Sequence, residues 1–187
     1  ISGKLWDMVD QFQDRFTSGD PVAVKGKVTE FNNHLQLTVT QVNQATNRQY
    51  GKYGFSLDFL LNSVEEPLND LWNRVIKVIA SLDKPYKEFT KDIFMEYEQK
   101  IRVMPGSVHH QNPIRGGFLK HLVTTAEMSR GILPYYPTLN KDLVLCGIFL
   151  HDIGKVESIN DDLLAGHTDA GKLKGHVALG IEILREA

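Results

Sequence analysis

Near the N-terminus, apolar and polar positions alternate in a way that predicts mainly strands. A first strand is expected over residues 1–6, followed by a short helical stretch over residues 8–16. Over residues 22–29, every second position is Val22, Val24, Gly26 or Val28, and the positions between them are Ala23, Lys25, Lys27 and Thr29. This period of two predicts a half-buried strand with a basic outer face. The alternation resumes at Leu35 after a loop over residues 31–34, so we expect a hairpin.

Beyond residue 62 the apolar positions follow the helical period instead. Two apolar stripes, separated by Lys84 and Pro85, predict two successive helices over residues 68–82 and 86–101. Three further helices are expected over residues 115–131, 139–152 and 172–186. The fold class is therefore α+β and multidomain. We expect a β-rich domain over residues 1–62 and an all-α domain with its helical linker over residues 63–187.

Composition says more about the cellular setting of the protein than about its function. The chain of 187 residues has a formal net charge of −2, so nucleic acid would have to be bound by local basic patches. The single cysteine, Cys146, rules out a disulfide within the chain and favours a reducing, cytoplasmic setting. The sequence has no apolar run of membrane length, and we expect no membrane partner. Whether the protein forms a homo-oligomer stays open.

One pair of residues stands out chemically, because His151 and Asp152 follow the apolar run of residues 143–150. An imidazole and a carboxylate placed there lose their hydration at considerable cost unless they find a partner. A divalent metal ion satisfies both, since neutral imidazole and carboxylate oxygen are common ligands of first-row metals. The alternative is a structural ion pair at a helix end. Gly154 is expected to end this helix, with Lys155 just beyond it.

Other histidines accompany this pair. His121 lies in the middle of an expected helix, and His176 lies in the first turns of another. Three helices that each contribute an inward polar residue are typical of metal sites in helical bundles. Taken alone, His121 would be read as a core histidine and His176 as a surface residue.

The motifs resemble those of a known family. Gly116-Gly117-Phe118-Leu119-Lys120-His121, His151-Asp152-Ile153-Gly154-Lys155 and Gly175-His176 resemble the HD superfamily of metal-dependent phosphohydrolases. The pair His109-His110, the segment at 136–140 and the stretch Thr168 to Gly171 are similar to the YhaM family of 3′–5′ exoribonucleases. That family carries an OB-fold ahead of its HD domain. The resemblance therefore implies that residues 1–62 form a partial OB-type barrel that binds nucleic acid, lacking its first strands.

The resemblance also implies roles for particular residues. His121, His151 and Asp152 would be metal ligands, and His176 a further ligand or a phosphate contact. Asp152 would also bridge two metals or orient the attacking water. Lys155 would hold a phosphate oxygen, with a solvated lysine at the helix end as the alternative. Nitrogen and oxygen donors suit manganese, iron, cobalt or nickel and do not select sharply among them. We expect Mn²⁺, with iron, cobalt or nickel as alternatives.

The chain departs from the family pattern at one point. HD sites need a final aspartate from a later helix, and we expect the chain to be incomplete before that helix. Asp161, Asp162 and Asp169 fall in an expected loop, and none of them is assigned the missing role.

Several residues are candidates for holding the substrate. They are His109, His110 and Arg115 near the expected metal site, and Lys25, Lys27 and Phe31 on the expected barrel. Basic and aromatic residues on one surface are typical of single-strand binding. One of the two histidines is expected to be a site residue and the other a loop residue, and which is which stays open. A solvated surface is the alternative for Arg115 and for the barrel residues. The expected function is a 3′–5′ exoribonuclease on single-stranded RNA that releases nucleoside 5′-monophosphates, and whether it also acts on single-stranded DNA stays open. The alternatives are an HD phosphohydrolase for mononucleotides or cyclic dinucleotides with a regulatory barrel, and a binding protein with an inert HD half.

Overall fold

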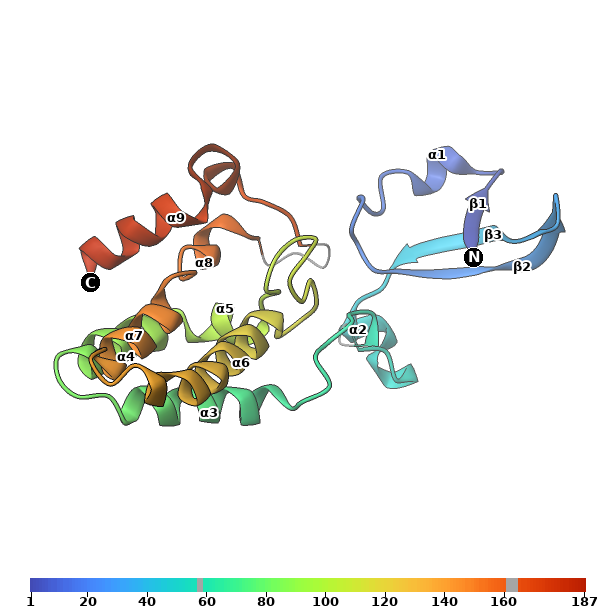
Figure 1. Ribbon diagram of the computed structural model, residues 1–187. Helices are drawn as coiled ribbons and strands as arrows, with labels where there is room; N and C mark the ends of the chain where they lie inside the picture. Colours follow the sequence, from blue (N-terminus) through green and yellow to red (C-terminus); the bar gives the residue numbers. More distant parts are fainter. Residues whose placement is uncertain (57–58, 161–164) are drawn as a thin grey trace. The chain divides into compact units, whose positions relative to one another are not determined.

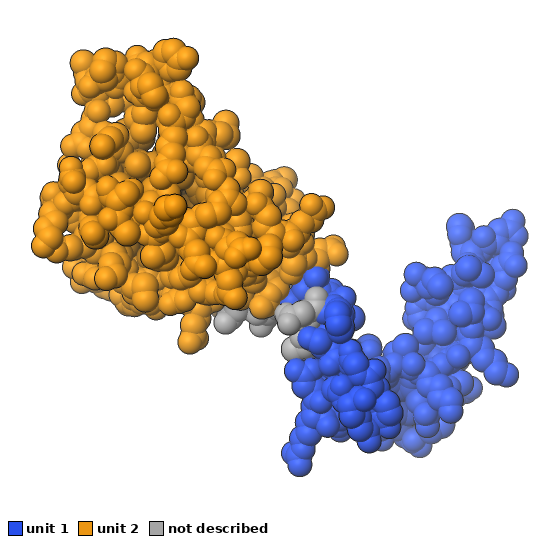
Figure 2. Space-filling model, turned by 90° about the horizontal axis from the view of Figure 1, so that it is seen from below, with its two compact units in different colours: residues 1–61 blue, residues 62–187 orange. Residues whose placement is uncertain are grey.

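The computed structural model describes residues 1–56, 59–160 and 165–187. The chain divides into two compact units, Ile1–Leu61 and Asn62–Ala187, which Figure 2 shows in different colours. Asp161 and Asp162 lie outside the described residues. None of the helices in the described part of the chain combines the length and the apolar character needed to span a bilayer.

The first unit contains a mixed sheet of three strands (Figure 1). In chain order its elements are β1 (Ser2–Leu5), α1 (Val9–Phe12), β2 (Val22–Phe31), β3 (His34–Gln44), α2 (Asn47–Tyr50) and the 3-10 helix η1 (Gly51–Tyr53). β3 lies in the middle, parallel to β1 and antiparallel to β2. The predicted first strand and hairpin are confirmed. The predicted helical stretch is shorter than expected and covers only four residues.

The hairpin turn is tighter than the expected loop. Asn32 and Asn33 both have left-handed backbone angles, with φ of 51° and 59°, which asparagine tolerates. Two such residues form the turn that matches the right-handed twist of the adjoining strands. Phe31 and His34 are therefore not loop residues, because they form the last pair of the ladder.

The expected half-burial of the second strand is wrong. Val22, Val24 and Val28 are all exposed, and Val28 reaches 57%. The strands alternate as expected, but these three valines stay exposed, whereas Val42, which pairs with Val24 from β3, is buried. A bulge between Lys25 and Gly26 shifts the register against β3. At that point the backbone of β3 comes so close that a Cβ on Gly26 would lie 2.3 Å from the carbonyl oxygen of Thr38.

The second unit is helical and contains most of the buried core. Its elements are α3 (Leu68–Ala80), α4 (Tyr86–Glu96), α5 (Glu98–Val103), α6 (Gly117–Ile132), the 3-10 helix η3 (Leu133–Tyr135), α7 (Lys141–Leu150), α8 (Lys155–Ser158) and α9 (Asp169–Glu186). The expected helices are confirmed except the one over residues 86–101, which is divided at Tyr97 into α4 and α5. The short helix α8 was not predicted. Phe94, Phe118 and Phe149 are fully buried where α4, α6 and α7 meet. This core holds α6 and α7, which carry the candidate chemistry, in fixed positions.

Candidate metal centre

Three side chains from two helices converge on one point in the second unit. His121 lies within α6, whereas His151 and Asp152 directly follow the last turn of α7. Each offers one ligand atom, and these atoms all lie within 4.8 Å of one another. Two histidines and a carboxylate at this spacing form a group that could hold a divalent ion.

His121 provides the least satisfied polar atom of the group. Its Nε2 is buried and has no hydrogen-bond partner among the described residues. It lies 3.7 Å from Asp152 Oδ2, beyond hydrogen-bond distance. Burial lowers the pKa of His121, so the ring is held in its neutral form, which is the form that binds metals.

His151 has its tautomer set by the backbone. Its Nδ1 lies 2.8 Å from the carbonyl oxygen of Ile148. A carbonyl can only accept, so Nδ1 carries the proton and donates it, and in the neutral ring the lone pair is on Nε2. That Nε2 lies 3.3 Å from Asp152 Oδ2. The hydrogen bond to Asp152 raises the pKa of His151, so a proton competes with any metal for this nitrogen.

Asp152 is the centre of the cluster and is only 7% exposed. Burial opposes its ionisation, but hydrogen bonds from His151 and Lys155 outweigh burial and hold the pKa of Asp152 well below its usual range. The carboxylate is therefore charged at any pH at which the protein is expected to work. Its two oxygens face different neighbours, because Oδ2 faces His121 and His151 while Oδ1 lies 3.3 Å from His176 Nε2.

His176 reaches Asp152 from α9. That helix is interrupted at Gly175, where φ is 74°, a left-handed angle that glycine adopts without strain. Gly154 does not end the helix as expected, because α7 already ends at Leu150 and Gly154 directly precedes α8, with φ of −62°. It serves a different purpose, because a Cβ there would lie 2.0 Å from the backbone oxygen of His176. The glycine thus lets α9 approach the turn that carries His151 and Asp152.

Lys155 is buried, whereas a residue just beyond a helix end was expected to face solvent or substrate. It is the first residue of α8 and is only 8% exposed. Its Nζ donates to Asp152 Oδ2 at 2.6 Å and to the carbonyl oxygen of Gly106 at 2.8 Å. The alternative of a solvated lysine at a helix end is therefore wrong, because the ammonium is enclosed and hydrogen-bonded to protein groups.

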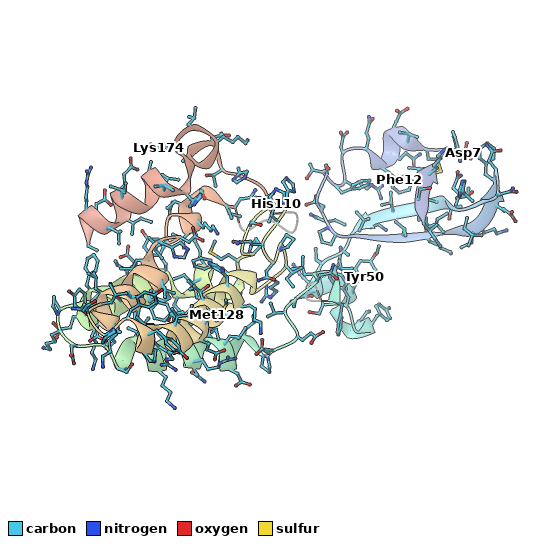
Figure 3. All side chains as sticks on the ribbon, viewed as in Figure 1. Asp7, Phe12, Tyr50, His110, Met128 and Lys174 are labelled. Atoms are coloured by element: carbon cyan, nitrogen blue, oxygen red, sulfur yellow. The ribbon has the colours of Figure 1, made fainter. Side chains whose placement is uncertain are left out.

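The remaining candidates of this unit lie in the segment before α6. His109 and His110 are exposed, and their ring centroids are 6.4 Å apart (His110 is labelled in Figure 3). Arg115 is half-buried, and its backbone pairs with residues 62–64. The group of three ligand atoms includes neither histidine of this segment.

In the first unit, the strand register places Lys25, Lys27 and Phe31 on one face of the sheet. The same register adds a residue that sequence reasoning missed. Lys4 pairs with Thr38 from one side and Lys27 pairs with it from the other, so the two lysines are neighbours across β3. The ammonium of Lys4 also lies 5.4 Å from the ring centroid of the exposed Trp6. The alternation of Lys4 and Trp6 along the first strand was the available signal.

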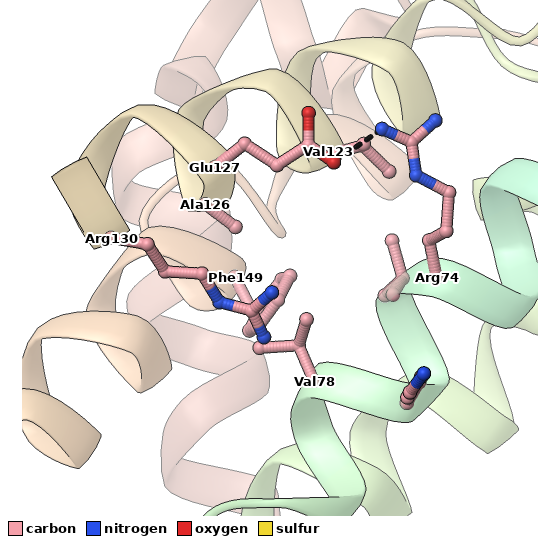
Figure 4. Close-up of a pocket in the computed structure, with 9 residues that line it drawn as sticks. Arg74, Val78, Val123, Ala126, Glu127, Arg130 and Phe149 are labelled. Atoms are coloured by element: carbon pink, nitrogen blue, oxygen red, sulfur yellow. Dashed lines mark hydrogen bonds and ion pairs between the residues drawn. The ribbon is translucent and has the colours of Figure 1, made fainter.

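A hollow elsewhere in the second unit has a different character. It has a volume of about 180 Å³ and lies between α3, α6 and α7, with Val75, Val78, Val123, Ala126 and Phe149 among its apolar lining (Figure 4). Its one acidic group, Glu127, is paired with Arg74. The hollow therefore offers no free carboxylate, and it contains none of the histidines described above.

Comparison with known proteins agrees with this arrangement. Residues 118–187 match the HD domain family. The chain is 26% identical over 188 residues to the 3′-5′ exoribonuclease YhaM of a Geobacillus species, covering all of this chain and 57% of the relative. The YhaM proteins of Shouchella clausii and Bacillus subtilis are 26% and 23% identical and cover 96% and 100% of this chain. The chain spans a little over half of their length, at 55% and 59%. No solved structure matches the chain significantly.

Proposed function

Since this chain is an HD-domain protein related along its whole length to the YhaM exoribonucleases, we propose that it belongs to a metal-dependent 3′–5′ exoribonuclease. The observation that carries the proposal is the buried Nε2 of His121, which has no partner among the described residues and faces Asp152. A buried polar nitrogen without a hydrogen bond costs about 1–3 kcal/mol. A ligand that accepts its lone pair would remove that cost.

The donor set fits a divalent metal. His121, His151 and Asp152 would hold it, and Mn²⁺ suits these nitrogen and oxygen donors, as do iron, cobalt and nickel. When bound, such an ion polarises a phosphoryl oxygen and lowers the pKa of a water. The protein's own part is to fix the donors: Ile148 sets the tautomer of His151, and Lys155 keeps Asp152 charged. His176 with Asp152 Oδ1 offers a further pair of donor atoms.

The sheet of the first unit is proposed to hold the single strand. Lys4, Lys25 and Lys27 lie on one face, with Phe31 at its hairpin end and Trp6 just beyond β1. Cations along a groove and exposed aromatic rings bind the backbone and the bases of single strands without reading sequence. The order of strand, short helix and hairpin supports an OB-type fold for this unit. Binding of this kind favours RNA or DNA with a free, unpaired end.

The polarity of the proposed reaction comes from the relatives, whose names specify 3′-5′ exoribonucleases. Attack of water on the terminal phosphodiester cleaves the bond to the 3′ oxygen of the preceding nucleotide. The released unit keeps the phosphate as a nucleoside 5′-monophosphate, and the shortened strand ends in a 3′ hydroxyl.

The test uses the complete enzyme, Mn²⁺ and a 5′-labelled single strand, with a stable 3′ hairpin as the matched substrate. A ladder that shortens from the 3′ end and a block at the hairpin are the expected results. Cuts in mid-chain from the earliest times would contradict the proposal. Rapid hydrolysis of free nucleotides without strand shortening would instead indicate a nucleotide phosphohydrolase.

A further inference from the structure

Lys155 is a buried cation, so neither contact with solvent nor a role on the protein surface explains its position. It is 8% exposed and lies over the ring of Phe118, with Nζ 5.9 Å from the ring centroid. A buried ammonium is costly unless its hydrogens and its charge are both matched. Here the charge is matched by Asp152 at 2.6 Å, and a second hydrogen is accepted by the carbonyl of Gly106 at 2.8 Å.

Gly106 belongs to a tightly closed loop between α5 and α6. Its N–H donates to the carbonyl oxygen of Asn112 at 2.9 Å, so the chain returns on itself around His109 and His110. A Cβ on Gly106 would lie 2.4 Å from the backbone oxygen of Gln111. The loop is therefore closed by its own backbone, and the Gly106 carbonyl accepts from Lys155.

One ammonium thus joins two parts of the proposed active site that are far apart in sequence. Asp152 is three residues from Lys155, whereas Gly106 is 49 residues away. Removing the ammonium would leave a buried carbonyl without a donor and a buried carboxylate without its closest counter-charge. Both groups would then have reason to move.

We propose that Lys155 is a positioning residue that ties the Asp152 carboxylate to the loop of residues 106–112, which carries His109 and His110. In this role it touches no phosphate. It sets the orientation of a metal-binding oxygen and the position of the loop together, so that donors and substrate contacts are held in one arrangement. The proposal rests on the proposed function for its catalytic consequence, but not for its structural one.

The structural consequence can be measured without metal or RNA. In the complete protein, K155M should speed amide hydrogen exchange in residues 104–117 by about tenfold, as expected for loss of a hydrogen bond from a charged donor. Exchange in α7 should stay unchanged. K100M is the matched control, because Lys100 Nζ also donates to a backbone carbonyl, that of Val156 at 3.2 Å, and Val156 is not one of the candidate ligands. It should leave exchange in residues 104–117 as it is.

The kinetic consequence separates positioning from phosphate binding. With Mn²⁺ and a small chromogenic phosphodiester, K155M should lower kcat by roughly 10–100-fold, as outer partners of metal ligands do, while KM changes less than about twofold. Raised KM with unchanged loop exchange would overturn the proposal in favour of direct phosphate contact.

If K155M does not fold, K155Q gives the same decision, since its amide NH₂ can still donate hydrogen bonds but carries no charge. Wild-type exchange together with wild-type kcat in K155Q would also overturn the proposal. A complete protein without any metal-dependent hydrolysis would contradict the proposed function, and the exchange measurement would still decide the role of Lys155.

Discussion

The two units of this chain build their candidate surfaces in opposite ways. In the second unit a continuous core fixes α6 and α7, and the ligand atoms of His121, His151 and Asp152 converge within 4.8 Å. In the first unit the buried apolar residues among those described are only Phe12, Val42 and Ala45. Its lysines are aligned by strand register and remain exposed. The comparison teaches that a metal centre depends on packing, whereas a strand-binding face needs only correct pairing.

The largest expected effect comes from removing a ligand at the packed centre. H151A should lose bound metal and more than the roughly 10–100-fold in hydrolysis that outer partners of ligands typically contribute. The side chain of His151 is 47% exposed, so its loss should leave the fold largely intact. D152A should lose metal as well, but it also leaves the buried Lys155 without its counter-charge and should destabilise the protein. Elemental analysis and circular dichroism measure the two effects separately.

D169N is the control for these variants. Asp169 also carries a carboxylate in the second unit, but its side chain is 95% exposed. Metal content and activity should match the unaltered protein. Unchanged metal content in both H151A and D152A would show that these residues do not hold the metal. The comparison of the two units would then lose its metal centre.

The next effect is a dependence of metal affinity on pH. Because its pKa is raised above the ordinary value, His151 is protonated at mildly acidic pH, and metal binding must displace that proton. Asp152 stays ionised and His121 stays neutral over this range, so one proton is expected to be released. Affinity should therefore fall by about tenfold for each pH unit below the pKa of His151 and level off above it.

Calorimetric titration of Mn²⁺ between about pH 5.5 and pH 8 measures this slope, and buffers of different ionisation enthalpy count the protons released. H34N, which removes a histidine of the first unit, should show the same slope as the unaltered protein. A flat affinity profile would mean that His151 is not a ligand.

The contrast between the packed centre of the second unit and the exposed sheet of the first also explains which features could be predicted from sequence. Helical period and strand alternation are local, so the helices, the first strand and the hairpin were predicted correctly. The three proposed ligands became visible through motif spacing together with a resemblance. The position of Lys155 could not be predicted, because it depends on Gly106, a partner brought in by tertiary structure. Lys4 was missed although its alternation with Trp6 was visible, because its pairing with Thr38 depends on tertiary structure.

Two predictions were wrong because a local sequence pattern does not show which tertiary contacts a residue makes. Gly154 looked like a helix end, because glycine commonly ends helices, yet its role is to permit the close approach of His176 from α9. Val28 looked half-buried, because alternation shows which residues share a face and not whether anything covers that face.

A smaller effect is expected from the exposed face of the first unit. Replacing Lys4, Lys25 and Lys27 with alanine should weaken single-stranded RNA binding and lower its salt slope by about 0.7 for each phosphate that is no longer neutralised. Hydrolysis of a small phosphodiester should be preserved, because no packing changes. K4A compared with K52A is the matched single-residue pair, since Lys52 lies in η1 of the same unit and outside the sheet. Equal slopes for K4A and K52A would show that the sheet face is merely solvated.

The smallest effect tests the packed centre through stability. In the metal-free protein, H121L removes a buried nitrogen that has no partner among the described residues and replaces it with an apolar side chain. We expect the free energy of unfolding to rise by about 1 kcal/mol, the lower end of the cost of such a group.

Saturating Mn²⁺ should make the unaltered protein more stable than H121L. At a hundred times its Kd, the metal stabilises the unaltered protein by about 2.7 kcal/mol and the variant by nothing. Denaturant unfolding with and without metal measures both values, and H34L, at an exposed position, should show neither change. If H121L is less stable than the unaltered protein without metal, the nitrogen has a partner in solution, and the observation that carries the proposed function is lost.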